Sequence, residues 1–142
     1  YCTMYHGVKA YMDATKEFVR KSGYAENLFG RRRYFPDIQS PLPQLRAQAE
    51  RMAINMPVQG TDADLMKLAM IAVYKELPRV CPEAKMILQV HDELVFEVPK
   101  KDVQRVAAFA KETMESISRI GIPTVVEARA GTNWAEMEKV VC

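Results

Sequence analysis

The sequence predicts an α+β fold in which a small antiparallel sheet is backed by helices. Three observations predict it. Apolar residues recur at three- and four-residue spacing in four separate stretches, as on helices that bury one face. Two runs of alternating apolar residues flank a short charged segment at residues 91–93, as in a β-hairpin. Glycines and prolines separate these stretches, as expected at turns and helix ends.

The first helix is expected over residues 8–19, where apolar side chains recur at helical spacing. It should stop before Ser22 and Gly23, because glycine readily takes the left-handed conformation that caps a helix. A short hairpin is expected over residues 24–35, and the proline-bounded stretch 36–43 should connect it to the next helix.

A second helix is expected over residues 44–55. Pro57 should interrupt or end it, because proline lacks an amide hydrogen and its ring clashes with the preceding turn. A third helix should begin at Thr61, since Thr61 and Asp64 have the spacing of a capping box. Asp62 would then lie favourably near the positive end of the helix dipole.

The charged hairpin follows, with apolar residues alternating over residues 86–90 and again over 94–98. Apolar spacing predicts a fourth helix over residues 103–117. A last strand is expected at residues 124–128, and a closing turn at 131–138.

The composition fits a soluble globular domain, because 49% of the 142 residues are hydrophobic and 27% are charged. The apolar runs are too short to span a bilayer, so no membrane partner is expected. Cys2, Cys81 and Cys142 are odd in number and far apart, which argues against a disulfide framework or a zinc site and favours a reducing cytoplasm. Because Tyr1 stands in place of an initiator methionine, we expect a fragment.

The tip of the charged hairpin is the strongest candidate site. His91, Asp92 and Glu93 lie between two strands, so a packed sheet would hold the Asp92 carboxylate at a rigid edge. Divalent metal ions prefer hard oxygen ligands held in this way. The residues alone leave a second interpretation open, because His-Asp-Glu also suits a solvated hairpin turn.

Basic residues gather in the first half of the chain, at Arg31, Arg32 and Arg33 and then at Arg46 and Arg51. The net charge of +2 is too small to indicate nucleic-acid binding, so their distribution matters more than their sum. Two interpretations stay open for the arginine run: a surface that faces phosphates, or a solvated basic turn.

Three motifs stand in order along the chain: LFGRRRY at residues 28–34, INMPVQGT at 54–61 and QVHDELV at 89–95. Together with Asn133-Trp134 near the terminus, they resemble the C-terminal end of family A DNA polymerases, most closely the bacterial DNA polymerase I type. The resemblance implies a DNA-directed DNA polymerase, a nucleotidyltransferase of DNA replication and repair in the bacterial cytoplasm, associated with the nucleoid.

In such an enzyme, residues 1–45 would be a distal fingers segment with the short hairpin. Residues 46–142 would be a C-terminal palm segment with the catalytic hairpin. The implied partners are primer-template DNA, deoxynucleoside triphosphates and the upstream part of the polymerase.

The resemblance also implies residue roles at the hairpin tip. Asp92 would be the carboxylate of the family's second catalytic motif and would bind Mg²⁺ in a two-metal site. Glu93 would support that site, and His91 would lie near the primer terminus. The family's first catalytic motif has no match in this chain, so an upstream carboxylate would complete the site and the chain alone would be inactive.

Arg51, Asn55 and Gln59 would line the DNA minor groove at the terminal base pair. Every correct pair presents acceptors at similar places in that groove, so donors there check shape without reading sequence. Gln59 should reach the groove only if Pro57 bends the chain.

Several alternatives remain. In one, Arg51 forms an ion pair with Glu50 or Asp64 in place of a DNA contact. In another, the whole chain is a stand-alone duplex DNA-binding module that uses the Arg51 face and Arg31, Arg32 and Arg33 without catalysis. In a third, the chain is an unstable gene fragment with no role. Asp62 also departs from the family pattern, which has a small apolar residue there.

Overall fold

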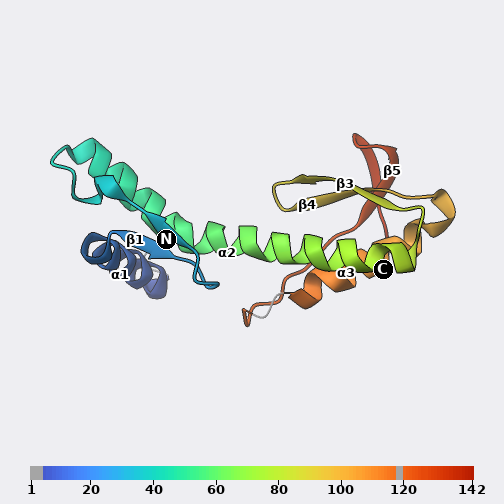
Figure 1. The fold of residues 1–142 in the computed structure, drawn as a ribbon, viewed down its shortest axis with the longest axis horizontal. Coiled ribbons are helices and arrows are strands. Elements are labelled where there is room, and N and C mark those ends of the chain that lie inside the picture. Colours follow the sequence, from blue (N-terminus) through green and yellow to red (C-terminus); the bar gives the residue numbers. More distant parts are fainter. Residues whose placement is uncertain (1–4, 118–119) are drawn as a thin grey trace. The chain divides into compact units, whose positions relative to one another are not determined.

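The computed structural model describes residues 5–117 and 120–142, which form helices and three two-stranded antiparallel sheets (Figure 1). The α+β prediction is confirmed, although the predicted small sheet is three separate hairpins. Two compact units, Tyr1–Asp64 and Leu65–Cys142, divide the chain. Helix α2 (Pro43–Val80) contributes to both. No helix in the described part of the chain is long and apolar enough to cross a bilayer.

The first unit contains helix α1 (His6–Ser22), which ends one residue later than predicted, directly before Gly23. Gly23 caps it with a φ of 79°, and its amide donates to the Val19 carbonyl at 2.8 Å. The predicted hairpin follows as strands β1 (Tyr24–Glu26) and β2 (Arg32–Tyr34). A 3-10 helix at Pro36–Gln39 forms part of the connector.

The core of this unit gathers side chains from α1, β1, the 3-10 helix and α2, together with Phe35 just after β2. Its apolar members are less than a tenth exposed: Val19, Ala25, Phe35, Ile38, Ala49, Ala53 and Met56. Because the α2 residues among them recur at helical spacing, this helix presents one apolar face to the hairpin and the opposite face to solvent.

The predicted helix break at Pro57 and the predicted new helix at Thr61 are both wrong, because α2 runs without interruption from Pro43 to Val80. Proline removes one intrahelical hydrogen bond, at a cost of about 3 kcal/mol. Packing of the buried face offsets this cost, as tertiary contacts do for most helices. The Thr61 hydroxyl donates back to the Pro57 carbonyl at 2.6 Å instead of capping a helix. Asp62 is therefore an exposed residue in the helix interior.

The second unit contains the charged hairpin, formed by β3 (Lys85–Val90) and β4 (Glu93–Glu97). A register shift at Ile87 makes a β-bulge. A 3-10 helix (Lys100–Asp102) leads into α3 (Val103–Ile117), and α3 confirms the predicted fourth helix. The core of this unit joins α2, β3, β4 and α3 through these residues: Val73, Leu77, Cys81, Ala84 and Val106, with Met86, Phe96, Val98 and Phe109 packed around them.

The last hairpin differs from the sequence prediction. Residues 124–128 are not a strand, and the pairing strands are β5 (Arg129–Asn133) and β6 (Glu136–Lys139). Trp134 lies at their turn and is 52% exposed. The predicted closing turn at residues 131–138 is thus a two-stranded hairpin.

Candidate functional site

The tip of the β3–β4 hairpin is a two-residue turn. Val90 pairs with Glu93 in register, which leaves His91 and Asp92 as the connecting residues. His91 has a φ of 52°, in the left-handed region that histidine enters more often than most residues. Its carbonyl accepts a hydrogen bond from the side-chain amide (Nε2) of Gln89 at 2.5 Å. The strand pairing and this bond therefore hold Asp92 at a tightly defined turn.

The carboxylates of Asp92 and Glu93 are exposed at this turn. Within the described residues, no hydrogen bond or ion pair engages the Asp92 carboxylate, so its oxygens remain available to a ligand. An oxygen donor of this kind fits Mg²⁺, which takes six oxygen ligands. No group of three or more His, Cys, Asp or Glu side chains in residues 5–117 and 120–142 is placed to hold a metal ion. The tip thus exposes carboxylate oxygens without a complete set of metal ligands around them in the described part of the chain.

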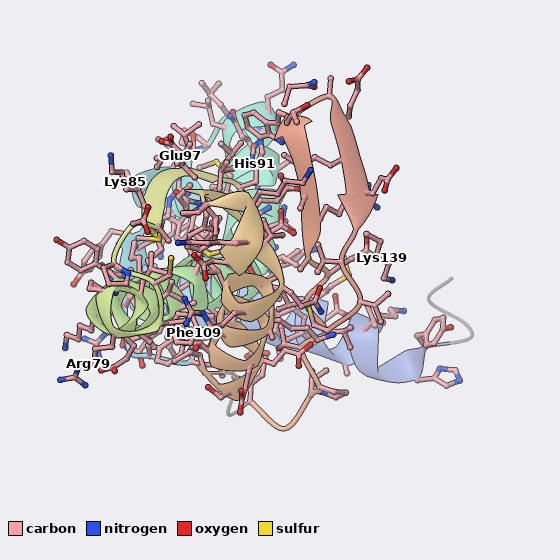
Figure 2. The ribbon with its side chains drawn as sticks, turned by 90° about the vertical axis from the view of Figure 1, so that its right-hand side faces the viewer. Arg79, Lys85, His91, Glu97, Phe109 and Lys139 are labelled. Carbon is pink, nitrogen blue, oxygen red and sulfur yellow. The ribbon has the colours of Figure 1, made fainter. Side chains whose placement is uncertain are left out.

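The far end of the same hairpin is anchored to helices. Figure 2 labels His91 at the turn and Lys85 and Glu97, which pair in register at the opposite end. Near that end, Met86 and Phe96 pack on the core shared by α2 and α3. Ile87 and Leu88, at the bulge of β3, are by contrast 50% and 49% exposed. The predicted packed sheet is therefore only partly covered.

A second candidate surface lies on α2 in the first unit. Arg51, Asn55 and Gln59 are all exposed and follow one another at four-residue spacing, so they share one helical face. Buried Ala53 and Met56 occupy the opposite face. Helix α2 continues through Pro57. Gln59 therefore lies on the same helical face as Arg51 and Asn55 without a helix break between them.

The predicted alternative of an Arg51 ion pair is wrong for both candidate partners. Glu50 accepts from Arg20 at 2.5 Å, and this hydrogen bond lowers the pKa of the Glu50 carboxyl. Asp64 accepts from Arg31 at 2.8 Å. Both carboxylates are thus engaged by other arginines.

The arginine run does not form one uniform surface. Arg31 binds Asp64, and the hydrogen bond raises the pKa of the Arg31 guanidinium. Arg32 donates to Glu26 at 2.5 Å and stacks over the Tyr24 ring at 4.5 Å. Their pairing means that these side chains are more ordered than a solvated basic turn would be.

Arg33 lies over the Phe35 ring, 5.5 Å from its centroid. All three arginines of the run nevertheless keep exposed surface. They can therefore still meet an anion, although Arg31 does so least freely because Asp64 already binds it.

Sequence reasoning missed Asn27, which is 5% exposed and bonded to α2. One feature of the sequence does point to Asn27. Asparagine just before a glycine-containing turn commonly accepts hydrogen bonds from backbone amides a few residues further on, and Asn27 accepts them from Phe29 and Arg31. Its contact with α2 depends on residues 33 and 37 positions away and is invisible in local sequence.

Comparison with known proteins gives consistent results. Residues 1–136 match the family described as DNA polymerase family A. Thermostable DNA polymerase I of Thermus thermophilus is 51% identical over 134 residues, which are 94% of this chain and 16% of that protein. DNA polymerase I of Pseudomonas aeruginosa is 46% identical over 96% of this chain and 15% of that protein.

Among solved structures, one similar to this chain is described as the POL domain of Pol1 from M. smegmatis in complex with DNA primer-template and dNTP. The match has a TM-score of 0.81 and 36% identity, and it covers 87% of this chain and 22% of that chain. The chain thus spans less than a quarter of the length of these relatives. With the sequence match over nearly all of its residues, the chain belongs to DNA polymerase family A.

Proposed function

We propose that this chain supplies one catalytic carboxylate motif and several DNA contacts to template-directed nucleotidyl transfer by a bacterial DNA polymerase of the cytoplasm and nucleoid. The observation that carries the proposal is the exposed Asp92 carboxylate, held at a two-residue turn in a chain of this family. Residues 1–45 contribute to the fingers and residues 46–142 to the palm.

In this proposal Asp92 holds Mg²⁺ and Glu93 supports the same site from the first residue of β4. When bound, a pair of such ions activates the attacking oxygen and stabilises charge on the leaving oxygen. A two-metal site needs carboxylates from more than one segment. Because the described residues contain no such cluster, a carboxylate from elsewhere in the polymerase completes the site. His91, beside Asp92 in the turn, lies near the primer terminus.

The exposed face of α2 serves the terminal base pair. Arg51, Asn55 and Gln59 all carry N–H donors, and minor-groove acceptors occupy similar positions in every correct pair. A donor row of this kind accepts any correct pair and loses hydrogen bonds at a misaligned one. The exposed parts of Arg31, Arg32 and Arg33 contact DNA phosphates, which adds affinity without sequence preference.

The test is Asp92→Asn in the full-length polymerase that contains this chain. Primer extension with Mg²⁺ and all four deoxynucleotides should be lost, by roughly a hundredfold or more, because an amide is a poor ligand for the ion. Primer-template affinity should stay near normal, since the DNA contacts remain. The matched control is Glu97→Gln on the same hairpin, which should retain activity. Near-normal turnover of Asp92→Asn would overturn the metal role.

A further inference from the structure

A buried polar cluster joins the turn of the β1–β2 hairpin to α2. It consists of Asn27, Arg31, Thr61 and Asp64, here called the Asn27 clamp. Asn27, Thr61 and Asp64 are only 5%, 5% and 6% exposed, although such residues usually lie at the surface. We propose that the Asn27 clamp positions Gln59 for its contact with the terminal base pair, an inference that rests on the function proposed above.

Asn27 holds the turn and the helix at the same time. Its Nδ2 donates to the Gly60 carbonyl at 2.8 Å and to Asp64 Oδ2 at 2.7 Å. Its Oδ1 accepts from the backbone amides of Phe29 at 3.0 Å and Arg31 at 2.9 Å. These four hydrogen bonds satisfy every donor and acceptor of the buried amide. Removal of the Asn27 side chain therefore removes its hydrogen bonds between the hairpin and α2.

Arg31 and Asp64 reinforce this connection. Arg31 Nε lies 3.0 Å from each carboxylate oxygen of Asp64, and its terminal nitrogen lies 2.8 Å from Oδ1. The Asp64 side chain is 9% exposed, against 60% for Arg31. A carboxylate this buried needs its partners, because an uncompensated charge in the interior is strongly destabilising.

The hairpin binds α2 immediately after Gln59, at Gly60, Thr61 and Asp64. Pro57 donates no amide hydrogen to the helix, so the ladder is one bond short immediately before this point. There, the Thr61 hydroxyl donates to the Pro57 carbonyl and accepts from the Leu28 amide at 3.2 Å. Asn27 binds the carbonyl of Gly60, the residue directly after Gln59. The backbone around exposed Gln59 is thus held by the hairpin as well as by the helix.

The other two residues of the proposed groove face are held differently. Arg51 and Asn55 precede Pro57, where buried Ala49 and Ala53 pack on the hairpin and α1. The nearby Ile54 carbonyl accepts from the Tyr11 hydroxyl at 2.9 Å. Loss of the clamp should therefore resemble loss of Gln59 and not loss of Arg51.

The experiment uses full-length polymerase and measures primer extension from a matched and from a mismatched terminus. Asn27→Ala, Asp64→Asn and Gln59→Ala are each compared with the parent enzyme. The clamp variants should shift the matched-to-mismatched ratio in the same direction as Gln59→Ala, by about twofold to tenfold, the range that one or two hydrogen bonds supply. In a Gln59→Ala background, Asn27→Ala should add no further shift.

The control is Lys21→Ala, which removes an exposed ion pair with Glu17 in the same unit and should leave the ratio unchanged. Thermal unfolding of each variant shows whether a changed ratio comes only from a less stable protein. If Asp64→Asn does not fold, Asn27→Ala alone provides the test. If Gln59→Ala shifts the ratio and Asn27→Ala does not, or if their effects add, the clamp is only structural and the inference falls. If Gln59→Ala itself does not change the ratio, the proposed minor-groove contact of Gln59 is refuted, and the clamp inference that rests on it is refuted as well.

Discussion

His91 is the one non-glycine residue with a positive φ in the described part of the chain, at 52°. L-amino acids enter this region at a cost of about 1–2 kcal/mol, and such strained residues gather at functional sites. The strain lies immediately before Asp92, at the tip of a two-residue turn. We therefore interpret the His91 conformation as part of how the turn directs the Asp92 carboxylate.

Substitution of His91 tests the backbone requirement. His91→Val should lower the free energy of unfolding by about 1–2 kcal/mol, because a β-branched residue resists positive φ. His91→Gly is the matched control and should be neutral or stabilising in the turn, since glycine takes this conformation at no steric cost. Chemical denaturation of both variants is the measurement. Equal destabilisation of the two would mean that the side chain, not the backbone, matters.

The β5–β6 hairpin shows how a single element depends on both glycine and charge. A register shift between Ala130 and Asn133 bulges the strand at Gly131. A Cβ built on Gly131 would lie 2.0 Å from the Glu136 carbonyl oxygen, closer than any real contact. The bulge therefore requires glycine because the facing backbone fills the space of a side chain.

Gly131→Ala should consequently destabilise the protein by about 1–3 kcal/mol, as overpacking usually does. Gly7→Ala is a suitable control, since a Cβ at Gly7 in α1 meets nothing within 4 Å. Alanine favours the helix there and should raise stability by up to about 1 kcal/mol. Thermal unfolding of the two variants should move in opposite directions. A Gly131→Ala protein as stable as the parent would contradict the observed bulge.

Glu127, just before β5, makes this end of the chain sensitive to acid. Hydrogen bonds from Lys139 at 2.8 Å and Arg129 at 2.7 Å lower the pKa of its carboxyl from 4.5 to about 2. Because the folded pKa lies below the unfolded one, the ionised form stabilises the fold above about pH 4.5. That stability should fall as the pH drops from about 4.5 to 2.

Glu127→Gln should remove this part of the pH dependence and leave stability at pH 7 slightly lower. Unfolding experiments at low salt across that pH range make the comparison, because salt screens exposed ion pairs. Glu112→Gln, an exposed glutamate on α3, should keep the parent's profile. A Glu127→Gln profile that matches the parent would show that the pairing contributes nothing.

The chain as a whole supplies parts of a polymerase and not a closed active site. The Thermus thermophilus relative is about six times as long as this chain, which covers 16% of it. Apolar side chains at Ile87 and Leu88, in strand β3 of the hairpin that carries Asp92, remain half exposed. On our proposal, the remaining polymerase provides the second carboxylate.

The isolated chain should therefore show no template-directed extension with Mg²⁺ and four deoxynucleotides, because one catalytic motif cannot build a two-metal site. Primer extension assays on the chain alone and on the full-length enzyme make this test. Activity from these residues alone would refute the need for a second catalytic segment. If the chain alone binds duplex DNA tightly and the full-length enzyme also fails to extend primers, the alternative of a non-catalytic DNA-binding module would be favoured.

Much of the fold can be predicted from the sequence because the patterns that specify these elements lie within short stretches of the chain. Apolar spacing and a glycine cap predict α1, and alternation predicts the hairpin that carries Asp92. The ordered motifs predict the polymerase family, which the comparisons show. A charged turn between two apolar runs is short-range information, and the chain alone contains it.

Tertiary structure decided the points where distant residues outweigh local propensity. Pro57 and Thr61 predict a helix boundary by their own chemistry, yet α2 continues because its apolar face packs on the hairpin and Thr61 bonds back to Pro57. Arg31 and Asp64 suggest a phosphate contact and a helix cap when taken separately. Folding places them 2.8 Å apart, and burial of the Asp64 carboxylate then favours this pairing over the expected helix cap, while the Arg31 side chain stays 60% exposed.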